Sequence, residues 1–357
     1  MTSSQSTRQV AGTYRYAGEP TLGAPTPDAR DNWRLLTFPA VLAVLVGGFA
    51  LFTRDVVLIG TFILAAAAVL VWCGLLLVST RRSGRVLSIE VVRRAQHWVQ
   101  ACGQGSLILY WAWHNHFVYG FFPFILAELI FAYCFDSLLS WSRRDRYTLG
   151  FGPFPIIFSI SLFLLFKPHW FYFQFLLIAV GFCAKEFIRW KKDGKTAHIF
   201  NPSSFPLAVM SVGLLLTGTT NISYGNVIAN SIFDTPHVHL FIFFIAFPVQ
   251  LLFGVARMTM AAAVTLFLIG LVYLAATGTY LFYDAYIPAA VFIGMTLLMT
   301  DPSTSPKTGV GRIAFGALYA LGTAFFFVLL ERFGAPTFYD KLLPIPFMNL
   351  MIRRIDR

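Results

Sequence analysis

Charged side chains are scarce in this sequence of 357 residues. Asp, Glu, Lys and Arg make up 12% of it, whereas 57% of the residues are hydrophobic and the mean hydropathy is +0.69. Soluble domains carry about 25% charged residues, so a single water-facing globule could not cover this much apolar surface. We therefore expect a polytopic integral membrane protein.

The sequence also lacks the motifs of several enzyme classes. It contains no P-loop, no G-x-G-x-x-G segment and no Ser-His-Asp arrangement, so hydrolase and nucleotide-driven pump chemistry have no basis here. No C-x-x-C pair is present, and the histidines lack supporting ligands. We expect neither a disulfide framework nor a metal site. Residues 1–33 show no cleavable signal peptide, and we interpret them as a flexible cytoplasmic tail.

Positive charge is in excess and occurs in short clusters between apolar runs. The formal net charge is +11, and the main clusters lie at 80–94, 142–147 and 189–198. Lys and Arg in short loops mark the cytoplasmic side of membrane proteins. We therefore expect a bacterial-type inner (cytoplasmic) membrane with the N-terminus in the cytoplasm, contact with membrane lipid, and no nucleic-acid partner.

Apolar runs long enough to cross about 30 Å of hydrocarbon recur along the chain. They should be helical, because lipid offers no partners for backbone N–H and C=O groups. They lie near 35–53, 56–79, 97–114, 117–140, 148–166, 169–188, 204–219, 237–255, 258–279, 284–300 and 311–331. The fold class is thus all-α, with about 10–12 transmembrane helices. We leave open whether the short stretch 342–352 also crosses.

The chain divides into three parts on this reading. The tail 1–33 is followed by two additional transmembrane helices and a basic cytoplasmic loop at 34–95, and a transmembrane core occupies 96–357.

Two segments share one unusual pattern. Residues 201–206 (N-P-S-S-F-P) and 301–306 (D-P-S-T-S-P) both read [Asn/Asp]-Pro-Ser-[Ser/Thr]-x-Pro and border apolar runs. Asn and Asp are preferred helix N-caps, and Pro is favoured at the first helical position. The hydroxyls that follow would surround free backbone N–H groups, which suits an anionic or polar ligand. Either each motif only caps a helix, or both form one site between duplicated halves.

The ligand-site hypothesis assigns a role to most polar residues of both motifs. Asp301 would cap the second helix, and Lys307, beside Thr308, would neutralise a phosphate of the ligand. Hydrogen bonds to the ligand would come from Asn201, Ser203, Ser204, Ser303, Thr304 and Ser305.

The same segments resemble a known family. The stretch M-T-D-P-S-T-S-P at 299–306 is similar to the M-A-T-D-P-x-x-[SA]-P segment of the RnfD/NqrB family, whose members are membrane subunits of ion-pumping electron-transfer complexes. H-I-F-N-P at 198–202 and the closing segment 334–356 resemble that family too. F-D-S-L-L-S-W at 135–141 and L-G-F-G-P-F-P at 149–155 resemble a narrower branch, the UnbU-type proteins associated with enediyne biosynthesis.

This resemblance implies an inverted-repeat core, a flavin and partner redox subunits. Family members carry FMN on the Thr of an S-G-A-T segment, which this sequence lacks. The nearest candidate is Thr235, in Asp234-Thr235-Pro236, without the Gly-Ala pair. We therefore expect noncovalent FMN, riboflavin or a quinone between the two motifs, rather than covalent attachment. The resemblance indicates an electron-transfer subunit; the alternatives are a small-solute or ion transporter and a redox-inactive structural subunit.

Ionisable residues within the apolar runs are further candidates, since an unpaired charge there costs several kcal/mol. Glu128 and Asp136 share one face of the fourth run and could relay protons or bind a cation. Asp136 could instead pair with an arginine of the following loop. Lys185 and Glu186 lie at the end of the sixth run. Lys185 either extends to the lipid headgroups or turns inward toward a phosphate or Asp301.

Overall fold

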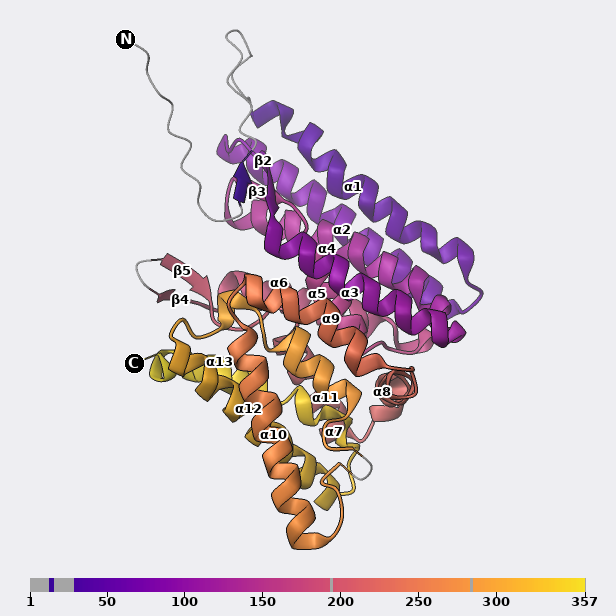
Figure 1. Ribbon diagram of the computed structural model, residues 1–357. Helices are drawn as coiled ribbons and strands as arrows, with labels where there is room; N and C mark the ends of the chain where they lie inside the picture. Colours follow the sequence, from indigo (N-terminus) through magenta and orange to yellow (C-terminus); the bar gives the residue numbers. More distant parts are fainter. Residues whose placement is uncertain (1–12, 16–28, 193–194, 283–284, 357) are drawn as a thin grey trace, which may run out of the picture.

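The computed structural model describes residues 13–15, 29–192, 195–282 and 285–356. Helices dominate the molecule, and a few short strands join them (Figure 1). The α-helices are α1 (Asn32–Gly48), α2 (Val56–Ser83), α3 (Ala95–His114), α4 (Phe122–Arg143), α5 (Pro153–Ser161), α6 (Tyr172–Phe187), α7 (Ser204–Thr217), α8 (Gly225–Phe233), α9 (Val238–Leu252), α10 (Ala256–Thr277), α11 (Ala289–Ile293), α12 (Gly309–Arg332) and α13 (Pro344–Ile355). The strands are β1 (Thr13–Arg15), β2 (Ser88–Arg94), β3 (Arg146–Leu149), β4 (Arg189–Lys192) and β5 (Lys195–His198).

Within the described residues, five helical stretches are long and apolar enough to cross a membrane. They are Ala29–Phe52, Val56–Ser83, His116–Arg143, Ala256–Thr277 and Gly309–Arg332. A sixth crossing results if α8 and α9, which meet at 98°, form one bent span. The prediction of a mostly helical, multi-pass membrane protein is confirmed at this level, while the larger number of about 10–12 crossings stays a prediction.

Strands β2 to β5 lie in the basic connections, whereas β1 precedes the first helix. β2 pairs in parallel with β3, β1 pairs antiparallel with β2, and β4 pairs antiparallel with β5. Helices were predicted only for the apolar runs, and the structure places short strands in the connections, since only backbone within the hydrocarbon is confined to helices. Figure 1 shows β2, β3, β4, β5 and the end of α13 at the same end of the molecule.

Helix α13 returns alongside α12 in the opposite direction. A Cβ atom on Gly322, in the middle of α12, would meet Pro344 Cβ at 2.7 Å. At the other end of α13, the Asp356 carboxylate accepts a hydrogen bond from Lys307 N at 2.8 Å, just before α12 begins. The stretch 342–352 therefore runs back along α12 from its middle to its first turn.

The predicted span at 148–166 is broken. Helix α5 has only nine residues, and the segment 162–166 that follows it is non-helical and buried. Gln174 of α6 satisfies its backbone: Oε1 accepts from Phe166 N at 3.2 Å, and Nε2 donates to Leu164 O at 3.2 Å. Irregular backbone is tolerated at membrane depth only where protein groups supply its hydrogen bonds.

The predicted span at 284–300 is also interrupted. Helix α11 passes at Gly294 into a π-helix, Gly294–Leu298, in which Met299 N donates to Gly294 O at 3.0 Å. The carbonyl oxygen of Thr296 in this turn accepts a hydrogen bond from Gln250 Nε2 of α9 at 2.7 Å. Such π-helical turns are rare and frequently occur at functional sites.

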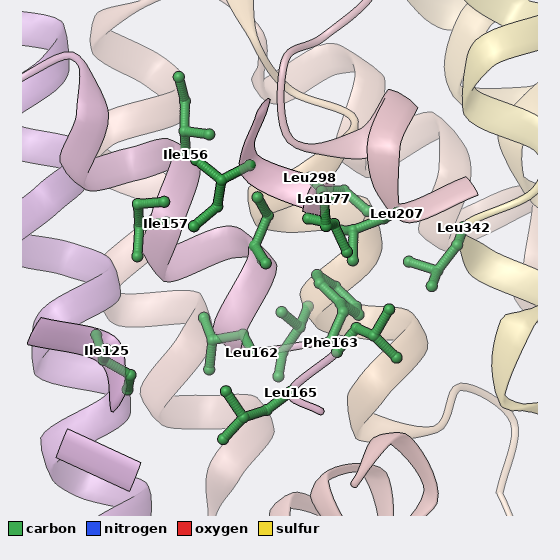
Figure 2. Packing of buried hydrophobic residues seen from close by; sticks show 14 of the residues in the cluster. Ile125, Ile156, Ile157, Leu162, Phe163, Leu165, Leu177, Leu207, Leu298 and Leu342 are labelled. Atoms are coloured by element: carbon green, nitrogen blue, oxygen red, sulfur yellow. The ribbon is translucent and has the colours of Figure 1, made fainter. Parts of the chain in front are cut away.

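An apolar core joins the two interrupted spans. Figure 2 shows Leu162 and Phe163, from the segment after α5, in one packed group with Leu177, Leu207 and Leu298. Each of these side chains is at most 2% exposed. Since helices in lipid associate chiefly through close packing, this core fixes α6, α7 and the π-helix, and with them the two Pro-Ser motifs.

Candidate functional site

Both Pro-Ser motifs fold into the same small turn. Asn201 Oδ1 accepts hydrogen bonds from Ser203 N at 2.9 Å and from the Ser203 hydroxyl at 2.7 Å. Asp301 Oδ1 accepts from the same two groups of Ser303, at 3.1 and 2.7 Å. A short Asn or Asp side chain reaches the backbone two residues on in this way. The sequence match therefore corresponds to a match in hydrogen bonding.

The two turns continue differently. The first leads directly into α7, which begins at Ser204. The second leads into a 3-10 helix, Pro302–Thr304, which Asp301 caps, whereas α12 is capped by Thr308, whose Oγ1 accepts from Gly311 N at 3.0 Å. The prediction that Asp301 caps the second long helix was wrong. The residue before a proline is disfavoured in the helical region, and Ser305, before Pro306, is extended.

Asn349 of α13 joins the two motifs. Its Oδ1 accepts from Asn201 N at 3.3 Å, and its Nδ2 donates to Thr304 O at 3.2 Å. Asn201 Nδ2 in turn donates to Leu298 O, at the end of the π-helix, at 2.9 Å. Asn349 is only 1% exposed, so water does not compete for these bonds. The motifs, 100 positions apart in the sequence, are thus held together.

A cavity of about 180 Å³ lies where the motifs meet, and we call it the motif cavity. Its walls come from the first turns of α3, the start of α5, the end of α6 and both motifs. Its polar lining consists of Arg94, Gln96, His97, Gln100, Gln104, Ser159, Lys185, His198, Asn201, Ser203, Asp301 and Ser303. Among the described residues that line it there is no Phe, Tyr or Trp.

Cationic side chains outnumber the anionic one in this lining. Arg94 and Lys185 border the cavity, whereas its described lining contains a single carboxylate, that of Asp301. The Asp301 Oδ2 atom lies 3.7 Å from His198 Nε2. Burial alone would raise the pKa of Asp301, but the nearby His198, together with hydrogen bonds from Ser303, lowers it to about 2. Asp301 is therefore ionised at neutral pH and lies beside His198, while the counter-charge of Lys185 is Asp136, which lies outside the lining.

The backbone N–H groups of the motifs are already used. Asn201 Oδ1 binds the N–H groups of Ser203 and Ser204, at 2.9 and 3.3 Å. Asp301 binds that of Ser303 at 3.1 Å. The prediction of free N–H groups at these helix starts was therefore wrong, because the capping side chains satisfy them. A ligand of the motif cavity has to be held by side chains.

The residues predicted to bind a ligand fall into three groups. Four border the motif cavity: Asn201, Ser203, Asp301 and Ser303. Three are buried beside it and form hydrogen bonds within their own motif: Ser204, Thr304 and Ser305. Lys307 and Thr308 lie before α12, where their backbone N–H groups donate to Asp356 at 2.8 and 3.1 Å.

Thr235, considered for flavin attachment, lies elsewhere, between α8 and α9. It is 3% exposed. Its hydroxyl accepts from Asn115 Nδ2 at 3.0 Å and donates to Ser231 O at 2.9 Å. Transfer of a flavin phosphate to this hydroxyl would require both contacts to open.

Glu128 is fully buried in α4. Its Oε2 accepts from Gln174 Nε2 at 3.1 Å and from the Ser161 hydroxyl at 3.3 Å, while Oε1 has no partner among the described residues. It therefore lies at the break after α5, separate from the lining of the motif cavity.

The other ionisable candidates form ion pairs at the basic end. Lys185 Nζ lies 3.8 Å from Asp136 Oδ1, and Lys185 borders the motif cavity together with Asp301. The structure thus pairs Asp136 with Lys185, where the sequence suggested an arginine of the following loop. Contact of Lys185 with Asp301 or with a phosphate stays a prediction. Glu186 pairs with Arg144 at 2.7 Å, so its carboxylate links the ends of α4 and α6.

Sequence reasoning missed several residues of the lining. Arg94 was interpreted only as an orientation signal, and His198 only as part of a resemblance. A usable signal was present in α3, where His97, Gln100 and Gln104 recur at helical spacing within an apolar run. Such spacing places polar side chains on one face, and a polar face on a membrane helix indicates a cavity or a partner.

Comparisons of this chain with protein-family models, with curated proteins and with solved structures found no match. The geometry of the motif cavity therefore has to carry the functional assignment.

Proposed function

We propose that this protein binds a small anionic solute in the motif cavity and transports it across the membrane. The observation that supports this function is the lining itself, in which Arg94 and Lys185 border the cavity together with one ionised carboxylate, that of Asp301. Charged groups inside a membrane protein are costly and are retained mainly along substrate or ion pathways. An anion that enters the cavity would supply the missing negative charge.

The interrupted helices support a transporter as well. Many transporters bind their substrates where discontinuous helices meet near the middle of the bilayer, between inverted repeats. Here α5 begins and the segment Ala289–Leu298 ends beside the motif cavity. The matched turns at Asn201 and Asp301 fit an inverted repeat, which we include in the proposal together with the larger number of crossings.

The membrane setting is part of the same proposal. Apolar side chains such as Leu64 and Val272 are 71% and 70% exposed, a surface that suits contact with lipid. The basic strands and the end of α13 gather at one end of the molecule (Figure 1). By the positive-inside rule, that end would face the cytoplasm of a bacterial-type inner membrane.

An electron-transfer subunit that binds a flavin or a quinone is the second candidate. It is favoured by the resemblance of 198–202 and 299–306 to the RnfD/NqrB family, and it would need redox partner subunits. Two features of the cavity speak against it. Among the residues that the structure describes, the lining offers no Phe, Tyr or Trp for stacking on a flat ring. Its volume of about 180 Å³ also falls below the roughly 300–1,000 Å³ of typical cofactor pockets.

Uptake of radiolabelled benzoate, a compact monocarboxylate, into proteoliposomes tests the transport function. We expect saturable uptake by the wild type. The benzoate concentration at half-maximal uptake should rise about tenfold in an Arg94→Gln/Lys185→Gln variant, since a hydrogen bond to a charged group contributes about 1.5–3 kcal/mol. Arg332→Gln, at the far end of α12, is the matched control and should behave like the wild type. Absence of uptake, or equal uptake by the double variant, would contradict the proposal.

An absorbance spectrum of the same preparation, before and after acid precipitation, tests the second candidate. Yellow colour in the supernatant would indicate noncovalent flavin, and colour in the precipitate would indicate attachment at Thr235. If the protein is colourless and also takes up no benzoate, the remaining candidate is a redox-inactive structural subunit.

A further inference from the structure

A second cavity lies on the other side of the interrupted span. It has a volume of about 230 Å³ and is bordered by α8, α11, α12 and the 3-10 helix Thr337–Lys341; Figure 1 shows α8 and α11 next to each other. The segment Ala289–Leu298 separates it from the motif cavity, because Ala289 and Ala290 border the second cavity and Leu297 borders the first. The two cavities therefore lie at opposite ends of one short helical segment.

A buried ion pair borders this second cavity. The side chains of Asp340 and Lys341 are 2% and 5% exposed, and Lys341 Nζ lies 3.2 Å from Asp340 Oδ1. The ammonium group also lies 4.5 Å from the centre of the Phe338 ring. Tyr319, near the middle of α12, donates its hydroxyl to the backbone oxygen of Lys341 at 3.2 Å. The pair thus lies about half-way along a candidate membrane span, where burying charge is costly.

The rest of the lining defines the kind of ligand that would fit. One wall is apolar, with Phe282, Phe327 and Val291. The lining also contains Asn226 and Asn230 of α8 and the ion pair. A ligand with one negative charge and an apolar body matches a lining with one cation, neutral amides and aromatic rings.

We propose that Asp340 and Lys341 form a proton-controlled binding site for a small monocarboxylate that carries an apolar group. While Asp340 is ionised, its own carboxylate occupies Lys341. When Asp340 takes up a proton, the ammonium group becomes available, and the carboxylate of the ligand takes the vacated place. One proton and one monoanion enter together, so the net charge of the site does not change. The ligand class rests on the proposed function, whereas the proton dependence rests on the ion pair.

The surroundings of the pair couple these two events. Within the described residues, Lys341 is the charged group that faces Asp340, and Tyr319 of α12 is the other titratable group. The lining residues of α8 and α11 are uncharged. If Asp340 alone were neutralised, Lys341 would stay buried without a counter-charge, which is strongly unfavourable. Protonation of Asp340 and binding of an anion must therefore favour each other.

Equilibrium binding of radiolabelled benzoate to the purified full-length chain tests this inference. We expect the wild type to contain a class of sites that binds about tenfold more tightly at about pH 5.5 than at about pH 7.5, because protonation of a buried carboxylate opens the site. In Asp340→Asn the neutral amide imitates the protonated acid, so this class should bind equally at both pH values. Wild-type pH dependence in Asp340→Asn would overturn the inference.

Two further variants separate this site from the motif cavity. Lys341→Met should lose the proton-dependent class of sites and keep the other; if it fails to fold, Asp340→Asn decides alone. Arg94→Gln/Lys185→Gln should lose only binding in the motif cavity. Proton-dependent binding that survives in this double variant, without any uptake, would support the second site and contradict the transport function. Uptake together with binding that has no component dependent on Asp340 would contradict the second site and support the transport function.

Discussion

The two polar atoms of the Asn349 side chain connect both Pro-Ser motifs. The oxygen accepts from the backbone of Asn201, and the nitrogen donates to the backbone of Thr304, in a place that is almost closed to solvent. Aspartate would keep the acceptor and lose the donor, whereas alanine would remove both. The residue therefore has a structural role that its position on an amphipathic terminal helix does not reveal.

We expect Asn349→Ala to lower the stability of the fold. Each backbone group that stays buried without a partner costs about 1–3 kcal/mol, so the melting temperature in detergent should fall clearly. Asn349→Asp should lie between the alanine variant and the wild type. Asn221→Ala, at an exposed position before α8, is the control. An unchanged melting temperature for Asn349→Ala would show that the motifs hold together without this contact.

Glu128 allows a second test at a single position. Glutamine keeps an acceptor for Gln174 and Ser161 and removes any charge from a fully buried site. We expect the free energy of unfolding of Glu128→Gln to lie within about 1 kcal/mol of the wild-type value. Glu128→Ala also leaves a void, and its free energy of unfolding should be lower by about 2–4 kcal/mol. Thermal unfolding measures both. A large loss in the glutamine variant would mean that the negative charge itself stabilises the fold.

Among the secondary-structure elements, α5 departs most from its predicted span. Residues 148–166 are apolar throughout most of their length, and hydropathy alone favours one continuous helix. The helix ends at Ser161 because the side chain of Gln174, eight residues beyond Phe166, supplies the hydrogen bonds that lipid cannot. A single glutamine in the next apolar run gave no indication from sequence alone of where its amide would bind.

Replacing that glutamine should therefore destabilise the break. Gln174→Leu leaves Phe166 N and Leu164 O without partners, at a cost of about 1–3 kcal/mol for each group. Faster hydrogen–deuterium exchange at Phe166 and a lower melting temperature are expected. Gln96→Leu, at a half-exposed position of α3, is the matched control. Exchange at Phe166 as slow as in the wild type would contradict this account.

The two motifs show how much of the site could be predicted from sequence patterns. Their local turns were predictable, because the short polar side chain before proline sets the turn. That the two turns meet was one of two alternatives that the sequence left open. The start of α12 could not be predicted from these patterns, since it depends on the extended Ser305 before Pro306 and on Asp356 from the far end of the chain. Arg94 and His198 were missed because the lining is assembled from segments that are far apart in the sequence.

For the molecule as a whole, the antiparallel arrangement of α12 and α13 places the end of α13 beside the start of α12. Single cysteines placed at Ser83 and Arg354, in a cysteine-free background, should react with a membrane-impermeant maleimide only after the membrane is opened. A cysteine at Thr220 should react in intact cells. This is expected because Ser83 and Arg354 lie at the basic end and Thr220 lies at a connection without Lys or Arg. Labelling of Arg354→Cys in intact cells would contradict the prediction that the end of α13 lies on the cytoplasmic side.

Transport as a whole should be electrically silent. If one proton enters with each monoanion at Asp340 and Lys341, an inward proton gradient drives benzoate uptake, and a potassium–valinomycin potential leaves it unchanged. Asp340→Asn should lose this dependence on the gradient. Uptake that responds to the potential would mean that the anion moves without its proton.

The π-helical turn Gly294–Leu298 has a consequence for tracing the ancestry of this chain. Such a turn holds one residue more than the corresponding stretch of α-helix. A homologue in which this stretch is fully α-helical would be one residue shorter between Pro288 and Asp301, and the gap in an alignment belongs within this turn. An alignment that puts the gap after the turn pairs Asp301 with a neighbour of its true counterpart, and the shared Pro-Ser signature then disappears from view.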